Sequence, residues 1–403
     1  VISYEVVRAA KRGAHVIIVD PRHIPLVDNA TLFLQIKPGT DIYIFLAIMH
    51  IIIREGWADE PFIAERTEGF DAFQAIVQEY TPEHAALKSG VPVEKIEEAA
   101  RIYAWGERAH GNSIYDGERG RSAIFYAMGI TQRSNGTDMV KTLANLAMLC
   151  GHVGKPSTGV NPLRGQANVQ GACDMGGLVN VYPGYQHVTD DEKRGAIARK
   201  WHVEDLPGKV GLTIVEAMHA VGKGQIKAQY VMGENPMMSD PDTTHVEHAL
   251  RSLDFLVVQD IFLSDTAQLA HVVLPATSSL EKDGTFTNTE RRVQMIQPVL
   301  PAPGLARFDW QITAEIAERF DQKMGQKREP GYWAYQSSAD IFAELTTVTP
   351  IYAGMSYARL KDQGLQWPCP TADHPGTPIL HSVAFSRGKG MFSVCEHKPP
   401  AEM

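Results

Sequence analysis

The residues best suited to chemistry lie in the middle of the chain, in the stretch NPLRGQANVQGACDMG from Asn161 to Gly176. The stretch holds one arginine, three glycines, two glutamines and two asparagines. The guanidinium of Arg164 presents its donors in a fixed fork that matches a planar carboxylate, and glycines let the backbone approach a large ligand closely. The pattern favours an anion-binding loop. Its alternative is a solvated surface loop whose arginine makes an ordinary ion pair.

A second polar run, EKDGTFTNTERRVQ from Glu281 to Gln294, is dense in hydroxyls, amides and paired arginines. Such a run could hold phosphates or a polar heterocycle. The other interpretation is a β-hairpin that turns on the KDG sequence. The residues alone leave both interpretations open.

Familiar catalytic motifs are absent. The sequence contains no Walker loop, no G-x-G-x-x-G entering a helix, no H-E-x-x-H and no G-x-S-x-G. Its four cysteines are far apart and form no C-x-x-C pair, which predicts reduced structural thiols rather than disulfides or a self-contained metal or iron–sulfur site. Cys150 and His152 are near neighbours on a helix and point in different directions, so Cys150 is predicted to be a packed thiol.

Length, composition and charge narrow the class of protein. A chain of 403 residues predicts two or three domains, and 44% hydrophobic with 21% charged residues is typical of ordered globular proteins. A net charge of -9 argues against non-specific nucleic-acid binding, although a small anion can still bind at a local positive site. The longest apolar run, Ile42 to Ile53, falls short of the roughly 20 residues of a membrane span and predicts a buried helix.

The start of the chain shows a helix followed by a strand. Residues 3–13 have helical spacing, and the apolar run at residues 14–22 predicts a strand buried on both faces that ends at Asp20. Asp20 either binds a ligand at the strand's carboxyl end or caps the following turn. Two helical segments are expected between residues 42 and 80, the second with Pro61 in its first turn.

The next elements lead to the candidate loop. Residues 105–122 are polar and glycine-rich, which predicts an exposed loop or insertion. A buried strand at residues 123–129 would place Gly129 and Gln132 at another strand end, and a helix at residues 138–154 follows.

The second half repeats this alternation. Three short β-rich runs, at residues 226–236, 255–262 and 271–277, surround a helix at residues 243–253 and predict a second parallel sheet with helices on both faces. Polar pairs follow the strands in order, and because parallel strands end at the same edge they predict a ligand crevice there. These pairs are Glu234 and Asn235, Gln259 and Asp260, and Thr277 and Ser278. Beyond Gly284 the sequence is less regular, apart from the helix FDWQITAEIAERF.

Together these segments resemble a known family. The stretch at Asn161–Gly176, with YVMGENP, VVQDIF, HVVLPAT and EKDGTFTNTERRVQ, is similar to the molybdenum or tungsten bis(molybdopterin guanine dinucleotide) oxidoreductases. Within that group the resemblance is to the catalytic α subunits of formate dehydrogenases, over nearly the whole chain. It implies an α/β chain with two Rossmann-like parallel-sheet domains that each bind a pterin dinucleotide, and a partial third domain.

The resemblance also implies roles for individual residues. Arg164 would hold the carboxylate of formate, and Gln132, Gly165 and Gln166 would lie near the metal. The residues implied for one dinucleotide are Asp20, Arg22, Gly39 and Asp41. Those implied for the other are Gly233, Asn235, Gln259, Asp260 and Thr266. The implied reaction is the interconversion of formate and CO₂ with two electrons and a proton.

The chain departs from the family pattern at two places. It contains neither a cysteine-rich segment for an iron–sulfur cluster nor a Cys or selenocysteine metal ligand followed by His, and it lacks the family's C-terminal domain that closes over both pterins. An internal part of a longer subunit is therefore expected, inactive alone. The implied domains span residues 1–166, 167–278 and 279–403. The expected partners are the remaining parts of the catalytic subunit and iron–sulfur electron-transfer subunits.

Two competing functions remain at this point. The first is another enzyme of the same superfamily, such as a nitrate reductase, and NVQGACDMG with the preceding arginine favours formate dehydrogenase over it. The second is a non-catalytic module that keeps the pterin-binding scaffold. A cytoplasmic location is expected, without a membrane span in this chain.

Overall fold

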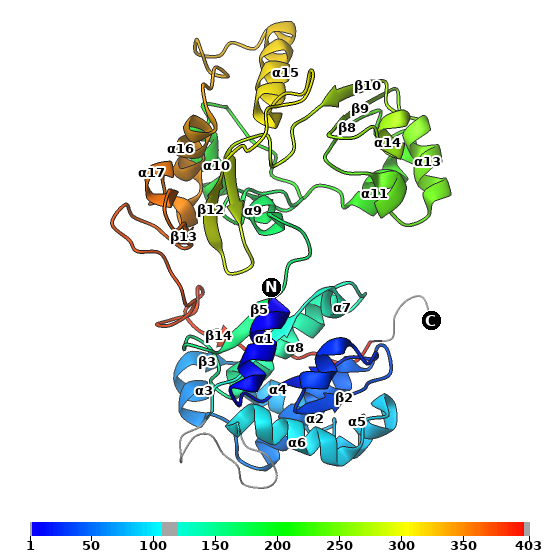
Figure 1. The fold of residues 1–403 in the computed structure, drawn as a ribbon, viewed down its shortest axis with the longest axis vertical. Coiled ribbons are helices and arrows are strands. Elements are labelled where there is room, and N and C mark those ends of the chain that lie inside the picture. Colours follow the sequence, from blue (N-terminus) through cyan, green and yellow to red (C-terminus); the bar gives the residue numbers. More distant parts are fainter. Residues whose placement is uncertain (1, 107–119, 399–403) are drawn as a thin grey trace. The chain divides into compact units, whose positions relative to one another are not determined.

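The computed structural model describes residues 2–106 and 120–398, so the expected loop at 105–122 lies largely outside the described residues. The chain divides into two compact units (Figure 1). Unit 1 comprises Val1–Gly165 and Ile379–Met403, and unit 2 comprises Gln166–Pro378. The boundary at 278 implied by the family stays a prediction about smaller subdivisions, because unit 2 continues through it.

The core of unit 1 is built around helix α2 (Asp41–Arg54), which confirms the buried helix expected from its apolar run. Eight of its apolar residues are buried, and full burial of each large one stabilises the fold by about 1.5–3 kcal/mol. Figure 1 shows it surrounded by other helices of the unit. These are α4 (Phe70–Val77), α5 (Pro82–Ser89), α6 (Val93–Trp105) and α8 (Gly136–Leu149).

Local sequence explains where these helices begin and end. The hydroxyl of Thr81 accepts a hydrogen bond from the backbone N–H of His84 at 3.2 Å, which caps the first turn of α5. The helix ends at Gly90, whose φ of +80° suits a residue without a Cβ. The second of the two helical segments expected before residue 80 proves to be two, α3 (Glu60–Arg66), with Pro61 in its first turn, and α4.

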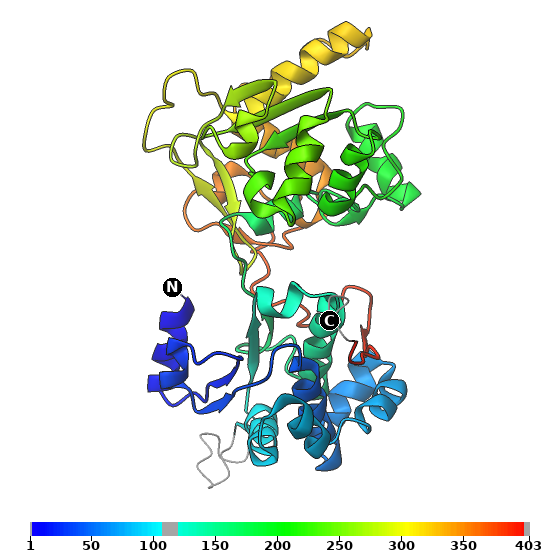
Figure 2. The same ribbon diagram turned by 90° about the vertical axis from the view of Figure 1, so that its right-hand side faces the viewer.

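Two separate pairs of parallel strands complete the framework of unit 1. Strand β1 (Ile17–Val19) pairs with β2 (Leu32–Leu34), and β4 (Ala123–Tyr126) pairs with β5 (Gly159–Pro162). The expected burial of the first strand on both faces is wrong, because each residue of β1 is only half-buried in this two-stranded sheet. The helix before it, α1 (Ile2–Lys11), contains no buried residue and lies at the side of the unit (Figure 2).

The segment after β4 also differs from expectation. The strand ends at Tyr126, and Gly129 lies in a short helix, α7 (Met128–Thr131), rather than at the strand end. Residues 123 and 124 are half-buried and Phe125 is 54% exposed, so this strand is not the buried one expected.

The carboxyl-terminal tail returns to unit 1. Strand β14 (Gly390–Met391) pairs with β3 (Thr67–Glu68), and the ring of Phe392 stacks on that of Phe73 with centroids 4.8 Å apart. The buried amide of Asn145 donates to the carbonyl of Ser393 at 2.7 Å and accepts from its N–H at 3.0 Å. The tail is therefore a packed part of the unit.

Unit 2 contains the second parallel sheet, as expected. Its order is β10–β9–β8, and all neighbours are parallel. The strands are β8 (Ala228–Met232), β9 (Phe255–Asp260) and β10 (Val272–Pro275). Helices α11 (Ile214–Gly222) and α13 (Thr243–Arg251) pack with the sheet around a core that includes Leu256 and Val258 (Figures 1 and 2).

The rest of unit 2 is more regular than the sequence indicated. Strands β11 (Gly284–Thr287) and β12 (Arg292–Ile296) form an antiparallel hairpin, to which β13 (Leu365–Gln366) adds. The hairpin interpretation is confirmed, but its turn spans residues 288–291 and not the KDG sequence, which precedes β11. Helix α15 (Asp309–Met324) is as expected, whereas α16 (Ser338–Val348), α17 (Tyr357–Leu360) and the helical turn η2 (Pro350–Tyr352) were not foreseen.

Several short elements connect these parts. They are η1 (Pro25–Asn29), α9 (Val169–Asp174), β6 (Val181–Tyr182), β7 (Gln186–His187), α10 (Asp191–Lys200), α12 (Pro236–Ser239) and α14 (Asp265–Gln268). Among the described residues, every helix is too short or too polar to cross a bilayer.

Candidate functional site

The carboxyl edge of the β8–β10 sheet gathers five of the expected binding residues. Gly233 directly follows β8, and its N–H donates to the carbonyl of Gln259 at 2.8 Å. Asn235 precedes α12, Gln259 and Asp260 end β9, and Thr266 lies in α14. Parallel strands end at one edge, so the fold brings these residues together as the sequence indicated.

The side chains of Asn235 and Thr266 join two loops of this edge. The Oδ1 atom of Asn235 accepts hydrogen bonds from the N–H of Thr266 at 3.1 Å and from its hydroxyl at 2.7 Å. The Thr266 hydroxyl oxygen also accepts from the N–H of Met237 at 3.1 Å. These contacts fix the starts of α12 and α14, so both residues shape the edge from within the protein.

Gln259 is fully buried and has a partner on each end of its amide. Its Oε1 accepts from the Tyr230 hydroxyl, and its Nε2 donates to Oδ1 of Asp309 at 2.6 Å. Asp309 also forms an ion pair with Lys282. The sequence reasoning missed Asp309 and Lys282, because they come from segments whose position only the tertiary structure reveals.

Two features of this edge favour a bound ligand, a buried hydroxyl that lacks a partner among the described residues and a glycine with open space beside it. The Thr277 side chain is 2% exposed, and its hydroxyl has no hydrogen-bond partner among the described residues. At Gly233, where φ is +65°, an added Cβ would meet no described atom within 4 Å. Asp260 is occupied in a turn, since its Oδ1 accepts from the N–H of Phe262 at 3.0 Å, and the Phe262 ring is 74% exposed beside it.

In unit 1 the expected binding residues of the β1–β2 edge follow the two strands, Asp20 and Arg22 after β1 and Gly39 and Asp41 after β2. Oδ1 of Asp20 accepts from the N–H of Arg22 at 2.7 Å and so stabilises the turn, and the Arg22 side chain is 83% exposed. Gly39 has a φ of +83°, and an added Cβ there would meet no described atom within 4 Å. Asp41 begins α2 and is buried against Arg133, a partner the sequence reasoning did not find. The second guanidinium contact of this pair is 3.3 Å.

The loop with Arg164 starts at the carboxyl edge of the β4–β5 pair. The N–H of Leu163 donates to the carbonyl of Tyr126 at 2.7 Å, and Arg164 follows immediately, with an exposed side chain. Burial raises the pKa of the Tyr126 hydroxyl, and the positive charge of Arg164 opposes that rise. Gln132 is exposed just after α7, which follows β4. Two parallel strands thus carry Gln132 and Arg164 from the same edge.

The two residues after Arg164 are exposed. Gly165 is the last residue of the first part of unit 1, and Gln166 is the first residue of unit 2. An added Cβ at Gly165 would meet no described atom within 4 Å, so the backbone there is accessible to a ligand.

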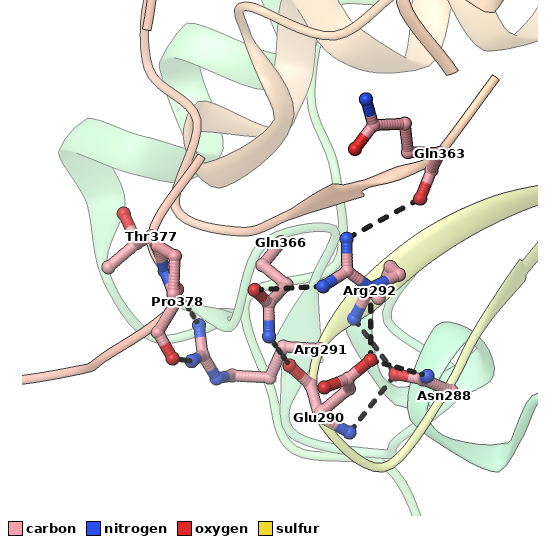
Figure 3. A network of polar contacts seen from close by, with 8 residues as sticks. All are labelled: Asn288, Glu290, Arg291, Arg292, Gln363, Gln366, Thr377 and Pro378. Atoms are coloured by element: carbon pink, nitrogen blue, oxygen red, sulfur yellow. Dashed lines mark hydrogen bonds and ion pairs between the residues drawn. The ribbon is translucent and has the colours of Figure 1, made fainter. Parts of the chain in front are cut away.

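The first arginine of the hairpin turn, Arg291, stabilises unit 2 through hydrogen bonds to backbone carbonyls. Arg291 has a φ of +68°, and its guanidinium donates to the carbonyls of Thr377 at 3.0 Å and Pro378 at 3.2 Å (Figure 3). It also donates to the carbonyl of Trp367 and lies over the Trp367 ring. Arg291 therefore holds the last residues of unit 2 against the hairpin.

The second arginine, Arg292, begins strand β12 and contacts both the turn and strand β13. Arg292 donates through Nε to Glu290 at 2.9 Å and through Nη2 to Gln366 at 3.3 Å, and the Gln366 amide donates to the carbonyl of Glu290 at 3.0 Å (Figure 3). These contacts account for both arginines without a phosphate, which favours the hairpin interpretation of this run.

The cysteines behave as packed thiols. Cys150 is 1% exposed at the end of α8, and Cys369 and Cys395 are also buried. All four cysteines lie among the described residues, and none of them forms a disulfide. The described residues contain no group of three or more His, Cys, Asp or Glu side chains placed to hold a metal ion.

Comparison with known proteins relates this geometry to a family. A family model described as molybdopterin oxidoreductase matches residues 1–319. The chain is 48% identical, over its full length, to F420-dependent formate dehydrogenase 1 subunit alpha of Methanococcus maripaludis, of which it covers 56%. It is 38% identical to formate dehydrogenase H of Escherichia coli, again over its full length and covering 54% of that protein. The chain thus spans about half the length of these relatives.

A solved structure shows the same fold. The structure of acetylene hydratase from Pelobacter acetylenicus superposes with a TM-score of 0.70 over 97% of this chain and 53% of that one, at 20% sequence identity. This likeness supports a mixed α/β fold with parallel sheets.

The family implies a molybdopterin cofactor with molybdenum or tungsten, and the edge of the β8–β10 sheet fits a polar group of that kind. The buried Thr277 hydroxyl lacks a partner among the described residues, and Gly233 leaves its surroundings open. An orphaned buried hydroxyl costs free energy that a polar ligand would recover. With the family model matching most of its length and relatives aligned from end to end, the chain belongs to the molybdopterin oxidoreductase family.

Proposed function

We propose that this chain is the central part of the catalytic α subunit of a formate dehydrogenase, and that Arg164 binds the carboxylate of formate. The observation that carries the proposal is the place of Arg164, exposed directly after the β4–β5 edge, in a chain 48% identical to proteins named as formate dehydrogenase α subunits. An exposed fork of donors suits a small planar anion better than a point charge does.

The proposal assigns each parallel-sheet region, as a Rossmann-like domain, to one pterin guanine dinucleotide. The residues that would hold the dinucleotide in unit 2 are Gly233, Asn235, Gln259, Asp260, Thr266 and Thr277. Those that would hold the other are Asp20, Arg22, Gly39 and Asp41, with Gln132, Gly165 and Gln166 toward the metal. Asn235, Thr266 and Gln259 would act mainly by fixing loops, because their polar atoms already have protein partners.

Arg164 orients the substrate in this scheme. Its two terminal nitrogens hold both oxygens of formate in one plane, so the C–H bond points in a single direction. Oxidation of formate to CO₂ releases two electrons and a proton, and accepting the electrons is the chemistry that a bound molybdenum or tungsten pterin centre supplies. Iron–sulfur subunits would carry the electrons away, and the cytoplasm stays the predicted compartment.

The test is Arg164→Lys in the full catalytic subunit loaded with its cofactor. Lysine keeps the charge but cannot form the planar fork, so we expect kcat/KM for formate to fall by about 100-fold. Arg12→Lys, the same change at an exposed position after α1, is the matched control and should leave kcat/KM unchanged. Wild-type kinetics in the Arg164→Lys variant would refute the role given to Arg164.

A nitrate reductase is the second candidate, since the chain is also 37% identical to the assimilatory nitrate reductase catalytic subunit of Bacillus subtilis over 98% of its length. Nitrate is likewise a planar anion, so the same arginine could bind it. Reduction of nitrate without formate oxidation by the loaded enzyme would favour this candidate.

A further inference from the structure

Two histidines on neighbouring helices of unit 2 lie in contact and have no part in the chemistry proposed above. His219 is on α11 and His245 is on α13. Their imidazole rings have centres 4.9 Å apart, with planes inclined at 49°. His219 is exposed and His245 is half-buried, so the pair is open to solvent on the His219 side.

Apolar packing fixes the separation of the two helices that carry this pair. Met218 of α11 and Val246 of α13 are buried in one core with strands β8 and β9. His219 follows Met218 in the sequence and His245 precedes Val246, so each imidazole lies next to a residue of that core. Helices α11 and α13 lie next to each other (Figure 1).

Caps fix the first turns of both helices. Oδ1 of Asp242 accepts from the N–H of His245 at 3.2 Å, which holds the backbone of this histidine. At the start of α11, the Glu216 carboxylate accepts from the N–H and from the hydroxyl of Thr213, each at 2.8 Å. Glu216 lies one turn before His219, but its carboxylate is engaged in this capping box. The backbone around both imidazoles is thus set before any ligand binds.

One ring nitrogen of the pair lacks a partner. Nε2 of His245 is buried and makes no hydrogen bond among the described residues. A Cβ placed on Gly222, the last residue of α11, would lie 3.5 Å from Cε1 of His245, so the outer edge of this ring lies against α11. A buried nitrogen without a partner costs free energy, which a bond to a ligand would recover.

We propose that His219 and His245 together bind a divalent transition-metal ion of the zinc class. Neutral imidazole is a ligand that suits Zn²⁺, Ni²⁺ and Cu²⁺. With Zn–N bonds of about 2.0–2.1 Å, the centres of two imidazoles on one ion lie about 5 Å apart. The observed separation of 4.9 Å matches this distance. The χ2 torsion of histidine is soft, so the exposed His219 ring can turn to admit the ion beside Nε2 of His245.

The two imidazoles leave the other coordination positions to water, because the described residues hold no group of three or more potential metal ligands. The site is therefore weaker than a structural zinc site with four protein ligands. A bound ion joins α11 to α13 and stabilises unit 2, since only the folded chain brings the two rings together. This role does not rest on the proposed function.

The test titrates zinc chloride into the full chain after treatment with EDTA and its removal. Calorimetry measures the stoichiometry and Kd, and thermal unfolding measures Tm with and without zinc. His219→Gln and His245→Gln each remove one imidazole. His187→Gln is the matched control, because His187 is an exposed residue of β7, elsewhere in unit 2.

We expect the wild type and the control to bind zinc with a stoichiometry of about one, and Kd to rise by roughly tenfold or more in each of the other two variants. At a zinc concentration about 100 times Kd, the Tm of the wild type and of the control should rise by several degrees, and EDTA should reverse the rise. At the same zinc concentration, His219→Gln and His245→Gln should keep nearly the Tm of their zinc-free forms.

Two results would overturn the proposal. Equal zinc affinity in the wild type and in both site variants would place the ion elsewhere, for example at the half-buried thiol of Cys173. A wild type that binds no zinc would show that the two rings only pack against each other. If His245→Gln fails to fold, His219→Gln decides alone, because His219 is exposed.

Discussion

The two carboxyl edges that carry the expected binding residues differ in how deeply their side chains are buried. At the β8–β10 edge of unit 2, Gln259 and Thr266 are fully buried and bonded within the protein. At the β4–β5 edge of unit 1, Gln132 and Arg164 are exposed. Internal hydrogen bonds between buried side chains hold the first edge, whereas the second places its side chains at the surface of unit 1.

This difference separates stability from ligand binding. Residues of the unit 2 edge contribute to folding whether or not a ligand is present, since their loss leaves buried groups without partners. Exposed residues of unit 1 contribute little to folding, so substitutions there report on binding alone. The comparison can be tested with variants that should behave differently at the two edges.

The largest effect is expected for Gln259→Leu. The change keeps the side-chain volume but leaves the Tyr230 hydroxyl and Oδ1 of Asp309 without their partner, so the free energy of unfolding should fall by about 1–3 kcal/mol. Gln35→Leu is the control, because the exposed Gln35 amide donates to the carbonyl of Pro21 in unit 1. Urea denaturation measures the free energy of unfolding of both variants. Equal losses in the two would contradict the proposed difference in burial between the two edges.

An intermediate effect is expected in the titration of two tyrosines. Burial raises the pKa of Tyr230 and the charge of Asp309 raises it further, whereas Arg164 lowers the pKa of Tyr126 against the effect of burial. Asp309→Asn should therefore lower the pKa of Tyr230, and Arg164→Gln should raise that of Tyr126. Phenolate absorbance, assigned with Tyr→Phe variants, measures each; a shift of the opposite sign contradicts the contacts described.

The same tyrosines link pH to folding. Both pKa values are raised in the folded protein, so their contribution to stability is complete below the unfolded value of about 10 and is lost as pH rises through the folded value. Above pH about 10 the free energy of unfolding should therefore fall less steeply with pH in Tyr230→Phe than in the wild type, which urea denaturation at several pH values measures.

The smallest effect is expected for Arg22→Ala. Its side chain is 83% exposed and its nitrogen lies 4.0 Å from Asp20, so removal should change the free energy of unfolding by less than about 0.5 kcal/mol. Cofactor content of the loaded subunit is the informative measurement. A clear loss of bound cofactor at unchanged stability would show that this exposed arginine serves a ligand.

Much of the fold followed from local sequence. The apolar run at Ile42–Ile53 became the buried helix α2, and three β-rich runs became a parallel sheet, because periodicity and length report how a segment buries its side chains. The predictions failed where the structure of a segment depends on contacts with other segments of the chain. Strand β1 is half-buried because only β2 pairs with it, and the KDG sequence lies before the hairpin because the turn formed at residues 288–291.

The expected site residues show the same limit. Their places at strand ends could be read from the sequence, as with Gln259 and Asp260, since polar residues followed each apolar run. Their partners could not. Nothing local to Asp41 indicates Arg133, and nothing local to Gln259 indicates Asp309.

The amino-acid sequence alone was enough for the buried helix α2, the three parallel β-rich runs and the family resemblance, because each depends on residues close together in the chain. Only the tertiary structure decided which polar groups satisfy one another. Arg133 and Asp41 are 92 positions apart, Gln259 and Asp309 are 50, and Tyr352 and Asp174 are 178. Buried polar groups need hydrogen-bond partners, and the fold can supply these partners from distant parts of the chain. Sequence patterns that span a few residues do not identify such partners.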